Sequence, residues 1–181
     1  MRKMRLLILV TVCFISAIIH DSLFALNRAG ALTFTLGGGN YYFSSKRHID
    51  NTSIPFVGLG YDLTDQWGIE VLGSVFNTDS DRPEDSGKQV NGALFLIDGV
   101  YHFSAYKALQ PFVTVGVGIL GLSPNGYDAR NEGNVNAGVG AQFFVNELIT
   151  IRLEAKDLYT INGGKNDIFL NAGMTFLFDI G

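Results

Sequence analysis

The stretch QWGIEVLGSV, residues 66–75, decides the fold class, because apolar residues alternate in it with small or polar ones. One face of an extended chain would carry Trp67, Ile69, Val71, Gly73 and Val75, and the other Gln66, Gly68, Glu70 and Ser74. A period of two residues is typical of a β-strand whose two faces meet different surroundings. We therefore predict a strand here, with one apolar face.

The same alternation recurs along the rest of the chain. The apolar sets are Leu32, Phe34 and Leu36; Val57, Leu59, Tyr61 and Leu63; Phe95, Ile97, Tyr101 and Phe103; Val113, Val115, Val117 and Ile119; Val135, Ala137, Val139, Ala141 and Phe143; Ile149, Ile151, Leu153 and Ala155; and Ile168, Leu170, Ala172, Met174, Phe176, Phe178 and Ile180. The opposite faces are rich in Gly, Thr, Asn and charged residues. Small and polar side chains suit a narrow lumen, and a continuous apolar face suits lipid.

These sets predict an all-β fold, an eight-stranded antiparallel transmembrane β-barrel. A closed barrel is the strand arrangement that pairs every backbone group within hydrocarbon. The alternative is a soluble, lipocalin-like barrel, which would bury the apolar face and expose the polar one to water.

The predicted connections alternate in length. Short turns are expected near residues 63–66, 104–109 and 146–147, and longer polar loops near 45–52, 78–88, 123–133 and 160–166. This alternation places the long loops at one end, with short turns and both termini on the periplasmic side. Aromatic residues of the outward face gather at the short-turn end and predict an interfacial girdle: Phe34, Tyr61, Trp67, Tyr101, Phe103, Phe143, Phe176 and Phe178.

The first 25 residues read as an export signal, which leaves residues 26–181 for the barrel. Arg2, Lys3 and Arg5 precede an apolar run at residues 6–19, too short to span a bilayer as a helix, and cleavage is expected after Ala25. A lipoprotein signal and an uncleaved anchor are less favoured alternatives, since Cys13 lies within the run. Cleavage removes that sole cysteine, which excludes disulfides, zinc clusters and cysteine nucleophiles.

Four motifs resemble the OmpA-like family of outer-membrane β-barrels. They are GYDLTDQWGIEVLG at residues 60–73, VYHFSAYKALQPFVTVGVG at 100–118, NAGVGAQFFVNELITIRLEAKDLY at 136–159 and NAGMTFLF at 171–178. The resemblance covers about residues 31–178 and implies a Gram-negative outer membrane, contact with its lipid and lipopolysaccharide, and insertion by the barrel assembly machinery. The peptidoglycan-binding domain of full-length OmpA is not among these residues, so cell-wall tethering is not part of the expectation.

Charged residues on the inward face are the candidate site. The resemblance implies that Glu70, Arg152 and Glu154 form an ionic network inside the barrel, and Asp98 and Lys156 share the inward phase. A charge on the lipid face would cost about 2 to 4 kcal/mol near the bilayer midplane, and an unpaired charge in a narrow lumen is also unfavourable. The network either fills and stiffens the lumen or forms an ion-pair gate.

Bulky inward residues favour a filled lumen over an open pore. Eight strands leave room only for side chains, and the alternation also turns Leu94, Leu96, Phe112, Phe144 and Leu177 inward. We therefore expect a monomeric structural or surface-interaction protein whose exposed loops contact host molecules, phage or neighbouring cells. A narrow ion-pair-gated channel is the alternative. The net charge of -4 disfavours a nucleic-acid partner.

An enzyme, a metal site and a cofactor are not expected. His102-Phe103-Ser104 resembles the His-x-Ser dyad of lipid A deacylases, but no acidic residue follows suitably in the next predicted strand, and the dyad falls at the short-turn end. A lipid A-modifying enzyme is therefore a remote alternative. The acidic residues of the loop near 78–88 lack the fixed spacing of a calcium site: Asp79, Asp81, Glu84 and Asp85.

Overall fold

The computed structural model describes residues 29–80, 87–124 and 129–179, which form eight strands and one short 3-10 helix. In chain order these are β1 (Ala31–Tyr42), η1 (Ser45–Arg47), β2 (Thr52–Asp62), β3 (Trp67–Asp79), β4 (Gln89–His102), β5 (Leu109–Pro124), β6 (Arg130–Phe144), β7 (Ile149–Thr160) and β8 (Lys165–Asp179). Within these ranges, no helix is long and apolar enough to cross a membrane.

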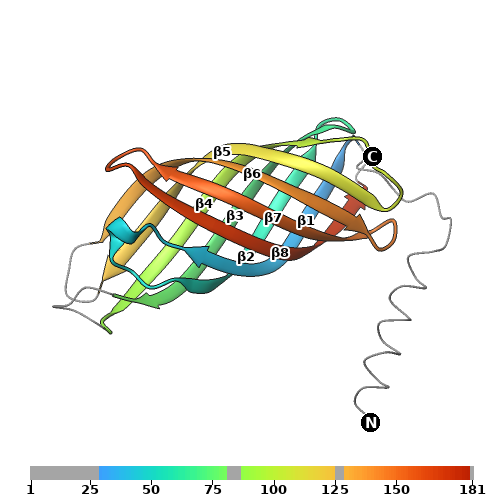
Figure 1. Cartoon of the computed structure of the whole chain (residues 1–181). Coiled ribbons are helices and arrows are strands. Elements are labelled where there is room, and N and C mark those ends of the chain that lie inside the picture. Colours follow the sequence, from blue (N-terminus) through green and yellow to red (C-terminus); the bar gives the residue numbers. More distant parts are fainter. Residues whose placement is uncertain (1–28, 81–86, 125–128, 180–181) are drawn as a thin grey trace, which may run out of the picture.

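Each strand pairs antiparallel with the next, and β8 returns to pair with β1. The closing register runs from Ala31 opposite Asp179 to Tyr42 opposite Ile168. The sheet is therefore a closed barrel (Figure 1), and closure leaves no unpaired strand edge. The prediction of an eight-stranded antiparallel barrel is confirmed.

The two ends of the barrel differ. β1 begins and β8 ends at the same end, where residues 63–66, 103–108 and 145–148 make the turns. We call this the terminal end. Residues 43–51, which contain η1, lie at the opposite end, the loop end (Figure 1).

Two predicted loops are wrong in extent. The loop expected at 123–133 is shorter, because β5 runs to Pro124 and β6 begins at Arg130. The loop expected at 160–166 shrinks to residues 161–164 between β7 and β8. The polar residues taken for loop belong to strands that continue beyond the apolar band, so a change to polar residues does not mark the strand end.

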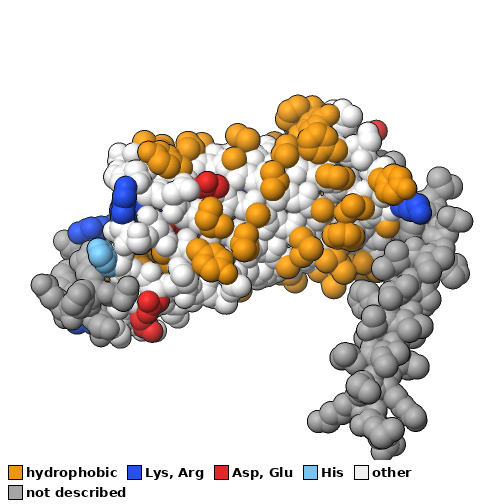
Figure 2. Space-filling model, viewed as in Figure 1, with side chains coloured by type: hydrophobic (Ala, Val, Ile, Leu, Met, Phe, Trp, Pro, Cys, Tyr) orange, Lys and Arg blue, Asp and Glu red, His pale blue; other side chains and the backbone are white. Residues whose placement is uncertain are grey.

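The outer wall carries an apolar band. The predicted outward sets point away from the lumen, and many of their large side chains are exposed, among them Val117, Val139 and Ile97. Figure 2 shows hydrophobic side chains spread along the wall, most densely toward the terminal end, with charged side chains mainly near the loop end. Toward the loop end the outward positions become polar, and Ser53 Oγ donates a hydrogen bond of 2.7 Å to Asn40 Oδ1 there.

The side chains that face the lumen become more apolar from the terminal end toward the loop end. Along β3 the inward residues are Gly68 and Glu70 near the terminal end, and then Leu72 and Phe76 toward the loop end. β4 shows the same order from Asp98 to Leu94 and Val90. The predicted polar interior therefore describes the terminal half, whereas the predicted apolar outer face extends into the loop half, as Val75 and Ile168 show. In the loop half the lumen is largely apolar, and the outer wall carries polar residues such as Asn77 beside apolar ones such as Val75 and Leu170.

This difference predicts unequal costs for the same charge on the outer wall. Val117→Lys places an ammonium in the apolar band and should lower the free energy of unfolding by about 2 to 4 kcal/mol. Asn77→Lys, at an exposed outward position near the loop end of β3, should change it by less than about 0.5 kcal/mol. Urea unfolding of both variants in phospholipid vesicles measures the difference. Equal losses would contradict the placement of the apolar band.

Candidate functional site

The ionic network begins with three charged residues on one strand. In the β7 segment IRLEAK, Arg152, Glu154 and Lys156 occupy alternate positions, so all three point into the lumen, where they are buried. Their acidic partners come from the far side of the ring, Glu70 on β3 and Asp98 on β4. Ion pairs therefore cross the lumen and join opposite walls.

The contacts form one chain of alternating charge. Arg152 Nη1 lies 2.5 Å from Glu70 Oε2, and Arg152 Nη2 lies 3.3 Å from Glu154 Oε2. Lys156 Nζ lies 3.4 Å from Glu154 Oε1 and forms a shorter ion pair with Asp98. All five predicted residues are thus brought together, each beside an opposite charge.

Neutral groups complete the contacts of the central carboxylate. Thr114 Oγ1 donates to Glu154 Oε1 at 2.8 Å, and Asn171 Nδ2 donates to Glu154 Oε2 at 3.3 Å. The Arg152 guanidinium lies 4.3 Å from the centre of the Phe112 ring, a cation-π contact. A buried charge is tolerated where ion pairs and hydrogen bonds replace its hydration.

Inward glycines make room for these side chains. A Cβ added at Gly138 would lie 2.8 Å from Glu154 Oε1, and one added at Gly116 would overlap the carboxylate of Asp98. The barrel is so narrow that a large inward side chain needs a residue without a side chain beside it. The glycines of β5 and β6 therefore help to position the network.

The predicted aromatic girdle lies on the outer wall at the terminal end. Trp67 and Tyr101 have ring centroids 4.8 Å apart, and Tyr101 and Phe103 5.1 Å apart. The remaining members are Phe34 and Phe176, whose rings stack with centroids 6.5 Å apart, and Tyr61, Phe143 and Phe178, which are exposed.

His102 and Ser104 point to different surroundings. His102 is buried in the lumen, with Nε2 3.8 Å from Asp62 Oδ1. Ser104 is exposed in the turn at 103–108. This arrangement gives no support to a His-Ser dyad, although Asp62 of β2 supplies the histidine with an acidic neighbour that we did not expect.

The candidate metal ligands fall mainly outside the described residues. Asp81, Glu84 and Asp85 lie there, and Asp79 is exposed at the end of β3. Among residues 29–80, 87–124 and 129–179, no group of three or more His, Cys, Asp or Glu is placed to hold a metal ion.

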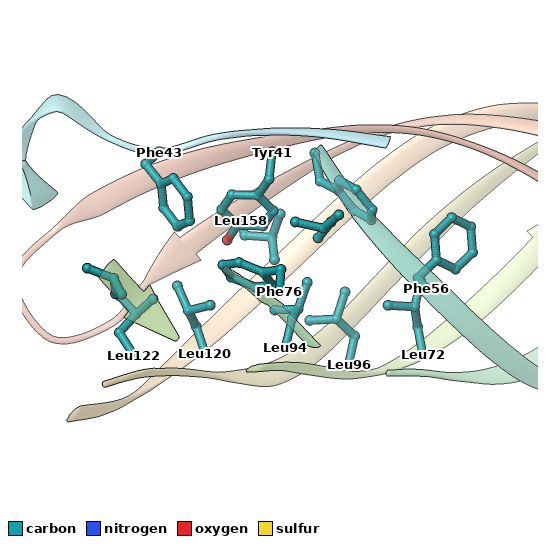
Figure 3. Close-up of a cluster of buried hydrophobic side chains, with 13 residues drawn as sticks. Tyr41, Phe43, Phe56, Leu72, Phe76, Leu94, Leu96, Leu120, Leu122 and Leu158 are labelled. Carbon is teal, nitrogen blue, oxygen red and sulfur yellow. The ribbon is translucent and has the colours of Figure 1, made fainter. Parts of the chain in front are cut away.

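The loop half of the lumen holds a cluster that sequence reasoning largely missed. We call it the apolar plug. Its members are Tyr41, Phe43, Ile54, Phe56, Leu72, Phe76, Val90, Leu94, Leu96, Leu120, Leu122, Leu158 and Phe169. Figure 3 shows side chains from facing walls meeting in the middle of the barrel. The rings pack closely, with centroids 4.6 Å apart for Tyr41 and Phe43 and 5.8 Å apart for Tyr41 and Phe169.

A second missed feature closes the loop end. Arg47 of η1 turns inward and is buried. Its guanidinium donates to Asp167 Oδ1 at 2.9 Å, to Glu132 Oε2 at 2.5 Å and to Thr160 Oγ1 at 2.7 Å. Residues 43–51 are therefore tied to β6, β7 and β8, and we call this segment the cap.

The two missed features differ in how visible they are in the sequence. The inward phase of Leu72 and Phe76 on β3 was a usable signal for the apolar plug, because these residues alternate with the outward set. Arg47 gave none, since it stands in a polar connection where basic residues are usually solvated.

Removing Arg152 should destabilise the barrel strongly. Arg152→Ala leaves Glu70 without its ion-pair partner, and breaking a buried pair in this way costs about 3 to 5 kcal/mol. The double variant Glu70→Gln and Arg152→Met should lose less, because Glu154 keeps Lys156. Urea unfolding in vesicles measures both, and a larger loss in the double variant would contradict the pairing.

Removing Arg47 should loosen the cap and leave the barrel wall intact. Arg47→Gln removes charged hydrogen bonds, each worth about 1.5 to 3 kcal/mol, so backbone amides of residues 43–51 should exchange with deuterium roughly tenfold to 100-fold faster. Lys46→Gln is the matched control, because Lys46 is exposed and bonds to Gly164 O. Mass spectrometry of peptides from both variants checks this. Equal exchange would show that Arg47 does not hold the cap.

The chain resembles known proteins both in sequence and in fold. The family model of the OprF membrane domain matches residues 4–181. Outer membrane porin F of Pseudomonas aeruginosa is 23% identical over 149 residues, which are 78% of this chain and 43% of that protein. The chain thus spans less than half the length of this relative.

Solved structures with the same fold include three outer-membrane barrels. The N-terminal β-barrel domain of Pseudomonas aeruginosa OprF has a TM-score of 0.63 at 18% identity, over 83% of this chain and 98% of that one. OprG of the same organism has a TM-score of 0.66 at 14% identity, over 85% and 98%. Neisserial surface protein A has a TM-score of 0.65 at 12% identity, over 82% and 99%.

Proposed function

Since this chain belongs to the family of the OprF membrane domain, we propose that it is a closed outer-membrane barrel with a structural or surface-interaction role. The loop end faces the cell exterior and carries the connections that contact host molecules, phage or neighbouring cells. The terminal end faces the periplasm.

The observation that carries this proposal is the filled lumen. The ionic network occupies the terminal half, the apolar plug occupies the loop half, and the cap closes over the plug. A cavity of about 20 Å³ near Asp62, His102 and Arg152 has room for roughly one water molecule. An eight-stranded barrel whose lumen is filled in this way supports a structural or surface-interaction role more than it supports a pore.

A narrow channel is the second candidate. The relative named outer membrane porin F carries that activity in its name, and the linked ion pairs of Glu70, Arg152 and Glu154 are the kind of contact that can exchange partners. In this alternative the five charged residues form the gate.

Location and partners follow from the same proposal. The relatives are outer-membrane proteins, so we propose that residues 1–25 direct export and are cleaved. The folded chain then contacts outer-membrane lipid and lipopolysaccharide and reaches the membrane through the barrel assembly machinery. We propose a monomer without catalytic activity, in keeping with the separation of His102 from Ser104.

Conductance across a planar lipid bilayer tests the closed barrel against the channel. Refolded wild-type protein should show no steady openings, because no continuous path of water passes the plug. Steady openings that Arg152→Ala abolishes or alters would overturn the proposal in favour of the gated channel. Slower migration of the boiled than the unboiled sample in a gel verifies that each preparation is folded.

A further inference from the structure

Most of the residues with unpartnered polar atoms lie in the terminal half of the lumen. Among the described residues, buried side-chain atoms without a hydrogen-bond partner belong to Asp62, Asp98, His102, Gln110, Asn134, Asn136, Thr150 and Asn171. Six of these residues lie on strands that also contribute to the apolar plug, and each of the six is nearer the terminal end than the plug residues of its strand. The other two, Asn134 and Asn136 on β6, lie at the level of the plug, with Asn136 opposite Leu158. On β5, for example, Gln110 precedes Leu120 and Leu122.

Such atoms require water. A buried donor or acceptor left without a partner costs roughly 1 to 3 kcal/mol, and native proteins satisfy such groups with ordered water. The distance of 3.8 Å between His102 Nε2 and Asp62 Oδ1 also suits a bridging water. We therefore expect ordered water molecules among the polar side chains of the terminal half, one of them in the cavity beside Asp62 and His102.

Apart from Asn134 and Asn136 on β6, the region of the apolar plug offers water no comparable groups. Its carbon side chains come from every strand except β6 and pack against one another across the lumen. Its one hydroxyl, that of Tyr41, already donates to Asp167 Oδ2 at 3.1 Å. A constriction of apolar side chains excludes water and hydrated ions by dewetting.

We infer that the apolar plug is the permeability barrier of this barrel. Water and small cations that enter from the terminal end reach the ionic network and stop before they reach the level of Leu94. The inference rests on the proposed closed lumen and locates its seal. The ion pairs then stabilise the hydrated half, and breaking them does not open the barrel.

Silver ion accessibility of single cysteines tests the position of the seal. In residues 26–181, which contain no other cysteine, Thr150→Cys places a thiol among the unpartnered polar groups, and Leu94→Cys places one inside the plug. Both substitutions are small enough to keep the fold. Folded protein in lipid vesicles is exposed to Ag⁺ for increasing times, then denatured, and the remaining thiol is counted with a maleimide.

The thiol at position 94 should react roughly 100-fold more slowly than the thiol at position 150, because an ion entering the plug must give up its hydration shell. Equal rates would overturn the inference, and so would slow reaction at both positions, since the terminal half would then be dry.

Conductance separates failure of this inference from failure of the proposed function. Leu94→Ser combined with Leu120→Ser should produce steady openings, whereas Arg152→Ala should stay closed. Openings in Arg152→Ala with an intact plug would move the seal to the ionic network and contradict the inference. Steady openings in the wild type would instead contradict the closed barrel itself, whatever the cysteine rates are.

Discussion

Closing an eight-stranded sheet into a ring creates a lumen that only side chains can fill, and the rest of this structure depends on that constraint. In the terminal half, lipid outside the wall forces polar and charged residues inward, so they must neutralise one another. The chain from Glu70 through Arg152, Glu154 and Lys156 to Asp98 achieves this across the lumen. The glycines beside these side chains leave the room that the charged side chains need in the narrow lumen.

The same constraint has another solution in the loop half. There some outward positions are polar, as Asn40 and Ser53 show, and fewer charged residues of the strands point inward. Leu94, Phe76 and their neighbours fill the lumen there as the core of a soluble barrel would. One continuous set of strand ladders thus joins a section with a charged interior to a section with an apolar interior. Arg47 then ties the cap over the open end of the second section.

The alternation of residues 66–75, repeated in seven further sets along the chain, was sufficient to predict the barrel, because alternation depends on the strand alone. It also placed the five network residues on the inward face. It did not distinguish the two halves, since a period of two separates faces without identifying the medium on either side; Phe76 therefore remained unassigned. The burial of Arg47 depends on Asp167 and Glu132, which lie far along the chain, and no local pattern encodes such contacts.

β7 carries three charges on the side chains that face the lumen, while their outermost partners stand on β3 and β4, across the ring. Until the last strand pairs with the first, Arg152 has no access to Glu70 at its final distance. A partly formed sheet in the bilayer would leave Glu70 and Asp98 without their partners on β7, at a high energetic cost. Charge neutralisation and ring closure are thus one cooperative step, so a half-built barrel has little stability of its own and assembly proceeds in a nearly all-or-none manner.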